Sequence, residues 1–356
     1  MTAARPACAA GTVSSAVHSP SAPPTPCRTE AAVTSLVVLG LVLLTGVGGL
    51  TSFGQAAFVG LGAYTTAYLT ARLGWSPWFN LLIGMAITMM VAYILGAITL
   101  RLSGHFLPLC TLAWGLALYY LFGNLEFLGQ YDGISGIAPL EFFGISLSSG
   151  RDIYYLIWAF ALLAMWGTRN LLNSRPGRAI RALKHGSGMA ESFGVNMANY
   201  KVIVFVYAAL LACISGWLYA HTQRFVNPTP FGLHMGIEYL FMALIGGVGS
   251  VWGALLGAGI LTLLKQWLQD WLPLLLGSQG NYETIVFGLL IVLLMQRSPG
   301  CLWPLLLRLT PARWRQGSGA PRADEQPPAL PRRQLPAGGE LILEAREVTK
   351  RFGGLV

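Results

Sequence analysis

No charged side chain occurs between residues 31 and 71. A continuous helix over this stretch would be about 60 Å long at 1.5 Å per residue, which is twice the roughly 30 Å hydrocarbon core of a bilayer. The stretch must therefore turn back on itself. The turn is predicted at residues 46–55 (GVGGLTSFGQ), where glycines and polar side chains cluster, between helices at about 33–50 and 56–71.

Long apolar runs recur through the rest of the chain. Charged residues make up 10% of the 356 residues, whereas a soluble domain carries about 25%. This pattern predicts an all-α polytopic membrane protein, a bundle of about 8 transmembrane helices with glycine-rich broken or re-entrant segments. The further uncharged runs lie at 79–100, 106–123, 153–168, 202–220, 239–264 and 282–296.

The run at 239–264 has glycines crowded at its centre, at Gly246, Gly247 and Gly249. Two shorter helices meeting at a turn, or a re-entrant hairpin, fit this sequence better than one straight span. Irregular backbone at membrane depth is tolerated only where it lines a cavity or is buried in protein.

A short basic segment, residues 169–201, interrupts the apolar runs with six cations and one acid. Lys and Arg near spans resist translocation, so this segment is predicted to be cytoplasmic. Residues 72–78, 124–152 and 221–236 then lie outside, and so do residues 1–32. The net charge of +9 reflects this bias and not nucleic-acid binding, because the cations do not form an amphipathic face with interleaved aromatics.

The two ends of the chain differ from the apolar middle. Residues 1–32 are rich in Pro, Ala, Ser and Thr and are expected to be disordered. A transmembrane domain is expected at 33–308, followed by an extended Pro-rich linker at 309–340. Residues 341–356 alternate apolar and polar side chains, which predicts an incomplete C-terminal β-strand stub.

Three stretches of the chain carry a family pattern. The first is TSFGQAAFVGLGAYTTAYL (51–69), and the second is LRLSGHFLPLCTLAWG (100–115) with DGISGI (132–137). The third, which is the most specific, is the segment PGRAIRALKHGSGMAESFGVNMANYK… (176–220) with ALIGGVGSVWGALLGA (243–258). These stretches resemble the permease subunits of branched-chain amino acid ABC importers, over roughly residues 33–308, and the first is similar to the family motif Leu-Ser-Leu-Gly-His-Ala-Ala-Phe-Phe-Gly-Ile-Gly-Ala-Tyr.

The resemblance implies a multi-pass permease of the bacterial inner membrane, which imports branched-chain or other hydrophobic amino acids. It implies a second permease subunit, ABC ATPase subunits that bind ATP and Mg²⁺, and an extracytoplasmic amino-acid-binding protein as partners. The chain itself would be no enzyme and would bind no cofactor. Alternatives are a permease for urea, short amides or another small solute, a secondary transporter or channel, and an inactive fragment.

In ABC importers generally, a cytoplasmic loop of the permease forms a coupling helix that docks on the ATPase. The resemblance places this helix at about residues 177–194. The sequence Lys184-His185-Gly186-Ser187-Gly188 departs from the family, which usually has acidic residues here. Because each glycine costs about 1 kcal/mol in a helix, a broken helix or weakened docking is expected; a plain solvated basic loop is the alternative. The coupling residues would be Gly177, Arg178, Arg181, Ala190, Glu191 and Gly194.

The terminal VTKRFGGLV (348–356) resembles the opening of the cognate ATPase subunit, as if a permease–ATPase fusion had been cut at its first strand. In that family an aromatic at the position of Phe352 stacks on adenine. No G-x-x-x-x-G-K-[ST] occurs in the chain, so nothing cradles the ATP phosphates. The chain alone is therefore not expected to hydrolyse ATP.

Substrate contacts are predicted at the two glycine-rich breaks, because half-helix termini and unwound backbone can hold the charged groups of an amino acid. Close helix packing explains the glycines equally well. Lys265, near a span end, is expected to extend its ammonium to the interface. The five cysteines show no metal or redox spacing. The candidate pathway residues are Ser52, Gln55, Gly246, Gly247, Gly249 and Ser250.

Overall fold

The computed structural model divides into two units, Met1–Leu309 and Thr310–Val356, and every helix and strand given below belongs to the first. The predictions for residues 1–25, for the run at 282–296, for the linker and for the C-terminal strand with Phe352 lie outside the described residues. The structure describes residues 26–100, 106–142, 145–146, 150–185, 187–192, 194–247 and 249–276, with isolated positions between 286 and 296 and at 346.

The first apolar stretch is broken where the sequence predicted. Helix α1 (Pro26–Leu41) continues as the π-helical turn η1 (Val42–Val47), and after an irregular segment α2 (Gln55–Leu73) begins. Gly49 adopts φ +69°, a left-handed conformation that favours glycine and ends the helical run. Helix α1 starts earlier than expected, so residues 26–32 are helical and not part of the disordered segment predicted for 1–32. Pro26 at the start supplies a φ suited to a first helical turn.

Four further helices confirm the prediction that the long apolar runs are helical. Helix α8 lies at the centre of their packing. Helix α8 packs against α1, α2 and α3, and its Ala208, Ala212 and Trp217 are fully buried. The approach of α2 to α8 is backbone to backbone, because Gly62 lies against the carbonyl of Cys213 and Gly216 against that of Val59. The four helices are α3 (Pro77–Thr99), α4 (Phe106–Asn124), α5 (Gly150–Asn173) and α8 (Met197–Gln223).

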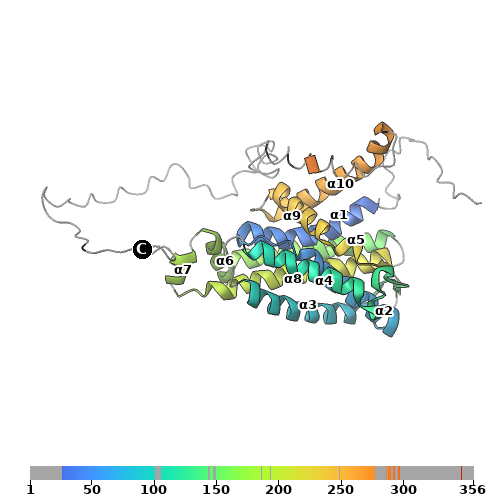
Figure 1. The fold of residues 1–356 in the computed structure, drawn as a ribbon, viewed down its shortest axis with the longest axis horizontal. Helices are drawn as coiled ribbons and strands as arrows, with labels where there is room; N and C mark the ends of the chain where they lie inside the picture. Colours follow the sequence, from blue (N-terminus) through green and yellow to red (C-terminus); the bar gives the residue numbers. More distant parts are fainter. Residues whose placement is uncertain are drawn as a thin grey trace, which may run out of the picture. The chain divides into compact units, whose positions relative to one another are not determined.

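The run at 239–264 forms the expected hairpin. Helices α9 (Leu233–Gly247) and α10 (Val251–Leu276) pack side by side, next to α1 (Figure 1). Gly246 lies against the backbone of Gly253 and Gly257, so a side chain at any of these positions would separate the helices. Gly247 has φ +123°, which only glycine adopts readily, at the start of the turn.

Two short helices and four short strands mark opposite ends of the bundle. The basic end carries α6 (Arg175–His185) and α7 (Ser187–Ser192) (Figure 1). The strand end carries β1 (Ile134–Ser135) paired with β4 (Phe225–Val226), and β2 (Glu141–Phe142) paired with β3 (Ile145–Ser146). These strands are small additions to the all-α class that the sequence predicted.

Contacts at the strand end join the three segments that the sequence placed on one side of the membrane. Ile134 pairs with Val226, and the indole of Trp78 donates to the carbonyl of Glu141 at 2.9 Å. The start of α1 lies there too, because Ser215 near the end of α8 donates to the carbonyl of Val33 at 2.9 Å. Residues 72–78, 124–152 and 221–236 therefore meet at one end, opposite the basic segment.

Five helical stretches of the described residues are long and apolar enough to cross a membrane. Helix α9 is shorter, at 15 residues, and α2 and α5 are not among the five. The chain is therefore a multi-pass helical membrane protein, while the total of about eight spans remains a prediction. The five stretches are Thr29–Val47, Pro77–Thr99, Phe106–Asn124, Met197–Gln223 and Val251–Gln269.

The contact between α2 and α8 gives a first prediction. Gly216→Ala places a methyl group against the Val59 carbonyl, so it should destabilise the protein by about 1–3 kcal/mol through overpacking. Gly259→Ala on α10 is the matched control, since no atom lies within 4 Å of its added Cβ. Thermal unfolding in detergent should show a lower Tm for Gly216→Ala only. Equal Tm values for the two variants would contradict the packing described.

Candidate functional site

Helix α6 is built to lie on the basic end with one face buried. Its first turn is capped by Ser174, whose hydroxyl accepts from the amide of Gly177 at 3.4 Å. Gly177 lies against the carbonyls of Leu171 and Leu172, where a side chain would not fit. Ile180 is fully buried, whereas Arg178 and Arg181 are exposed. The helix therefore presents a basic face away from the bundle.

The coupling segment predicted at 177–194 is two helices, not one, because α6 ends at His185 and α7 begins at Ser187. Helix α7 ends in a Schellman motif, in which Gly194 donates to Glu191 and Val195 donates to Ala190. Gly194 adopts φ +80°, which explains the glycine there. Ala190 is half-buried and Glu191 is exposed. This break agrees with the glycines of the Lys184–Gly188 sequence.

Lys184 connects the basic end to the broken first span. Its ammonium donates to the carbonyl of Gly46, in η1, at 3.2 Å, and its stem lies against Gly49. A π-helical turn leaves carbonyls that an α-helix would have paired, so a side-chain donor there stabilises the break. Sequence analysis treated Lys184 only as a departure from the family. Lys184 is exposed, but its spacing of four residues from the buried Ile180 places it toward the side of α6 that contacts the bundle, and that signal could have identified it.

Ser52 and Gln55 lie inside the bundle, beside this break. Each is 1% exposed, and neither side chain has a hydrogen-bond partner among the described residues. The segment is fixed by its backbone, since the amide of Phe53 donates to the hydroxyl of Thr111 on α4 at 3.3 Å. Buried polar groups are usually paired. The two side chains are therefore available to a polar group or water that enters the bundle.

The second group of predicted pathway residues has a structural explanation in the hairpin. Ser250 accepts from the amide of Gly253 at 2.9 Å and so caps α10. Gly246 and Gly247 serve the close packing and the turn, and Gly249 is exposed. Within the described ranges no hydrogen bond joins this group to Ser52 or Gln55. The first group thus lies beside η1 and the second in the turn between α9 and α10.

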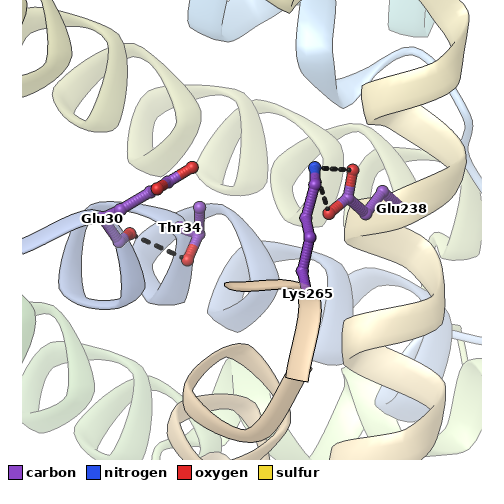
Figure 2. Close-up of polar contacts among 4 residues, drawn as sticks. All are labelled: Glu30, Thr34, Glu238 and Lys265. Carbon is purple, nitrogen blue, oxygen red and sulfur yellow. Dashed lines mark hydrogen bonds and ion pairs between the residues drawn. The ribbon is translucent and has the colours of Figure 1, made fainter. Parts of the chain in front are cut away.

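A cavity of about 710 Å³ opens at the strand end, lined by residues of α1, α2, α5, α8, α9 and α10. Lys265 of α10 reaches into it and lies 3.0 Å from each carboxylate oxygen of Glu238 on α9. Glu238 is 4% exposed and Lys265 29%. Figure 2 shows Glu30 on α1 with its carboxylate turned toward the side on which Lys265 lies.

The Lys265–Glu238 pair corrects the expectation that Lys265 simply extends to the interface. A carboxylate buried among apolar helices requires a counter-charge, and the hairpin supplies it by folding α10 back on α9. Neither Glu238 nor Glu30 was among the site residues predicted from the sequence. The signal that could have found the pair is the position of one acid and one base on either side of the predicted turn.

The fold and these ends define the class of protein: a multi-pass helical membrane protein with a basic end, a broken first span and a charged cavity at the opposite end. A family model described as "Branched-chain amino acid transport system / permease component" matches residues 28–295. The chain belongs to this family. Its relatives are components of transport systems and not enzymes.

Individual relatives are similar over most of the chain. The high-affinity branched-chain amino acid transport system permease protein LivM of Salmonella typhimurium is 28% identical over 291 residues, covering 75% of this chain and 67% of LivM. BraD of Pseudomonas aeruginosa, with the same description, is 29% identical and covers 75% and 91%. The fructose import permease protein FrcC of Rhizobium meliloti is 25% identical and covers 67% of each chain. No solved structure matches.

The buried ion pair gives a second prediction. Lys265→Met leaves Glu238 without a counter-charge and should destabilise the protein by about 3 kcal/mol, the low end for a buried pair because Lys265 is partly exposed. The double variant Glu238→Gln/Lys265→Met should recover most of that loss. Thermal unfolding of the single and double variants in detergent measures this coupling. Additive losses, with the double variant least stable, would show that the pair does not stabilise the fold.

Proposed function

We propose that the chain is a membrane-spanning permease of an ATP-driven importer for branched-chain amino acids in the bacterial inner membrane. The observation that carries this proposal is the family match over residues 28–295, together with relatives named for high-affinity branched-chain amino acid transport. The working assembly would add a second permease subunit, ABC ATPase subunits that bind ATP and Mg²⁺, and an extracytoplasmic binding protein.

In this proposal the basic end faces the cytoplasm and the strand end faces outward. The concentration of arginines on α6 supports that orientation, because Lys and Arg accumulate on the cytoplasmic side of spans. The segments joined at the strand end, residues 72–78, 124–152 and 221–236, contain no comparable basic cluster. The cavity at the strand end would then open toward the binding protein.

The ATPase would dock on the face formed by α6 and α7, and Lys184 would carry its movement into the bundle. The exposed Arg178, Arg181 and Glu191 can meet a partner, while Lys184, a neighbour of Arg181 on the helix surface, donates to the carbonyl of Gly46. A push on α6 therefore reaches η1 and the adjacent Ser52 and Gln55 by direct contact, as a rigid-body shift.

A finer part of the proposal rests on sequence alone. Residues 341–356 would begin an ATP-binding domain, with Phe352 stacking on adenine, as the resemblance implies.

A second cargo class is represented among the relatives, because FrcC is named for fructose import. A sugar lacks the ammonium and carboxylate of an amino acid, so the charged cavity favours the amino acid.

Transport by the reconstituted assembly tests the proposal directly. The full complex in liposomes, with ATP inside and binding protein outside, should accumulate leucine only when ATP is present. Leucine uptake without ATP would contradict an ATP-driven importer. ATP hydrolysis stimulated by binding protein but without leucine uptake would contradict the proposed cargo, and fructose uptake in the same liposomes would then identify the second class.

Lys184→Met tests the coupling route in the same assay. Loss of the bond to Gly46 should lower leucine uptake per ATP hydrolysed by about 3–10-fold, since a lost charged hydrogen bond is worth about 1.5 kcal/mol or less at an exposed site. Arg169→Met is the matched control, an exposed cation of the same segment. An unchanged ratio in Lys184→Met would rule out transmission through this contact.

A further inference from the structure

The charged side chains of the strand-end cavity balance one another. Lys265, Arg224 and Glu30 line the cavity, and Glu238 lies behind Lys265 as its ion-pair partner. Among the described residues these give two positive and two negative charges. A cavity with balanced charge accepts a neutral or zwitterionic ligand at least electrostatic cost, whereas an ion of either sign would leave one charge without a partner.

The cavity offers a hydrogen-bond donor on Lys265 and an acceptor on Glu30, which lie on different helices. An ammonium carries three protons, and the bonds to the two oxygens of Glu238 leave one proton of Lys265 for a ligand. Glu30 accepts no hydrogen bond at its carboxylate from any described residue, although its backbone carbonyl accepts from Thr34 at 3.0 Å. Figure 2 shows Glu30 and Lys265 approaching from different helices, α1 and α10.

Three hydroxyl donors of the cavity are already engaged with backbone carbonyls, two within their own helix and one across to α1. Thr34 donates to the carbonyl of Glu30, Ser215 to that of Val33 at 2.9 Å, and Thr222 to that of Leu218 at 2.7 Å. A ligand carboxylate therefore finds its strongest donors on Lys265 and Arg224. A ligand ammonium finds its strongest acceptor on Glu30.

Another part of the wall is apolar. Side chains of Val33, Val59, Ile153, Phe231 and Met235 line the same cavity. Its volume of about 710 Å³ lies within the usual range of about 300–1,000 Å³ for small-ligand sites. A branched aliphatic side chain can be buried against this wall while its charged groups meet the polar side.

We propose that this cavity is a binding site for an amino acid zwitterion on its way through the permease. Lys265, assisted by Arg224, receives the carboxylate; Glu30 receives the ammonium; the side chain lies against Val33 and Ile153. This inference rests on the proposed function and assigns the residues that recognise the cargo, which the sequence placed at the two glycine-rich breaks.

Helix α1 supplies a route from this site to the ATPase. Glu30 lies in its first turns and Gly46 in the η1 turn that extends it, 16 residues later along the chain, about 24 Å at 1.5 Å per residue. Lys184 holds the Gly46 end. A shift of α6 that moves α1 along its axis changes the separation of Glu30 and Lys265, and this releases a ligand held between them.

The test uses the reconstituted full complex with saturating binding protein and compares leucine uptake with ATP hydrolysis. Glu30→Gln removes the ammonium acceptor, and Glu238→Gln/Lys265→Met removes the carboxylate donor without leaving a lone buried charge. Each should lower leucine imported per ATP at least 10-fold, while stimulated ATP hydrolysis stays within about 2-fold. Glu30→Asp keeps the charge and should recover most uptake. Matched controls are Asp152→Asn and Arg151→Gln, exposed charges at the start of α5 outside the cavity lining.

The outcomes separate this site from the proposed function. If the wild type, Glu30→Gln and the double variant all import leucine equally well, the proposed binding site is wrong. The proposed importer function would still stand. A parallel fall of uptake and hydrolysis, with Glu30→Asp as impaired as Glu30→Gln, would show a structural role and also overturn it. A wild-type complex that hydrolyses ATP without importing leucine would overturn the proposed cargo itself.

Discussion

Backbone polar groups in a bilayer have no water to pair with, and this constraint governs the two breaks in the described apolar runs. The irregular backbone around η1 lies against Thr111 of α4 and Lys184 of α6, and the hairpin turn is closed by its own cap at Ser250. Both breaks are thus paired within the protein, as the hydrocarbon core requires. Glycines at Gly62 and Gly216 let α2 and α8 approach closely enough to exclude lipid from between them.

Helix α1 with its η1 extension contacts functional residues at both ends of the bundle. At one end its π-helical extension receives the ammonium of Lys184. At the other end Glu30 faces the cavity that holds Lys265. Because α1 packs against α5, α8, α9 and α10, it cannot shift without rearranging the cavity walls. A contact at the basic end therefore has a mechanical consequence at the strand end.

The sequence predicted the features that depend on local composition, and it missed those that depend on which residues meet. The runs free of charge predicted the helices, and the glycines predicted the breaks at 46–55 and 245–250. The buried Lys265–Glu238 pair could not be read from composition, because 27 residues separate its members and only the hairpin brings them together. Lys184 was likewise identified only as a departure from the family pattern, since its acceptor lies 138 residues away.

The central claim is that α6 and the broken first span move as one unit. Cross-linking the two segments and measuring transport tests this claim most directly. A Cβ at Gly49 would lie 3.5 Å from that of Lys184, within reach of a disulfide, so Gly49→Cys/Lys184→Cys can replace the ammonium bond with a covalent one. Leucine uptake per ATP should be low in the reduced double variant and should rise on oxidation to the level of the Gly49→Cys single variant, which carries the same strain of a side chain at φ +69°. Each single cysteine variant should be insensitive to oxidant. Uptake that stops when the disulfide forms would show that the two segments must slide past each other, and would contradict the account.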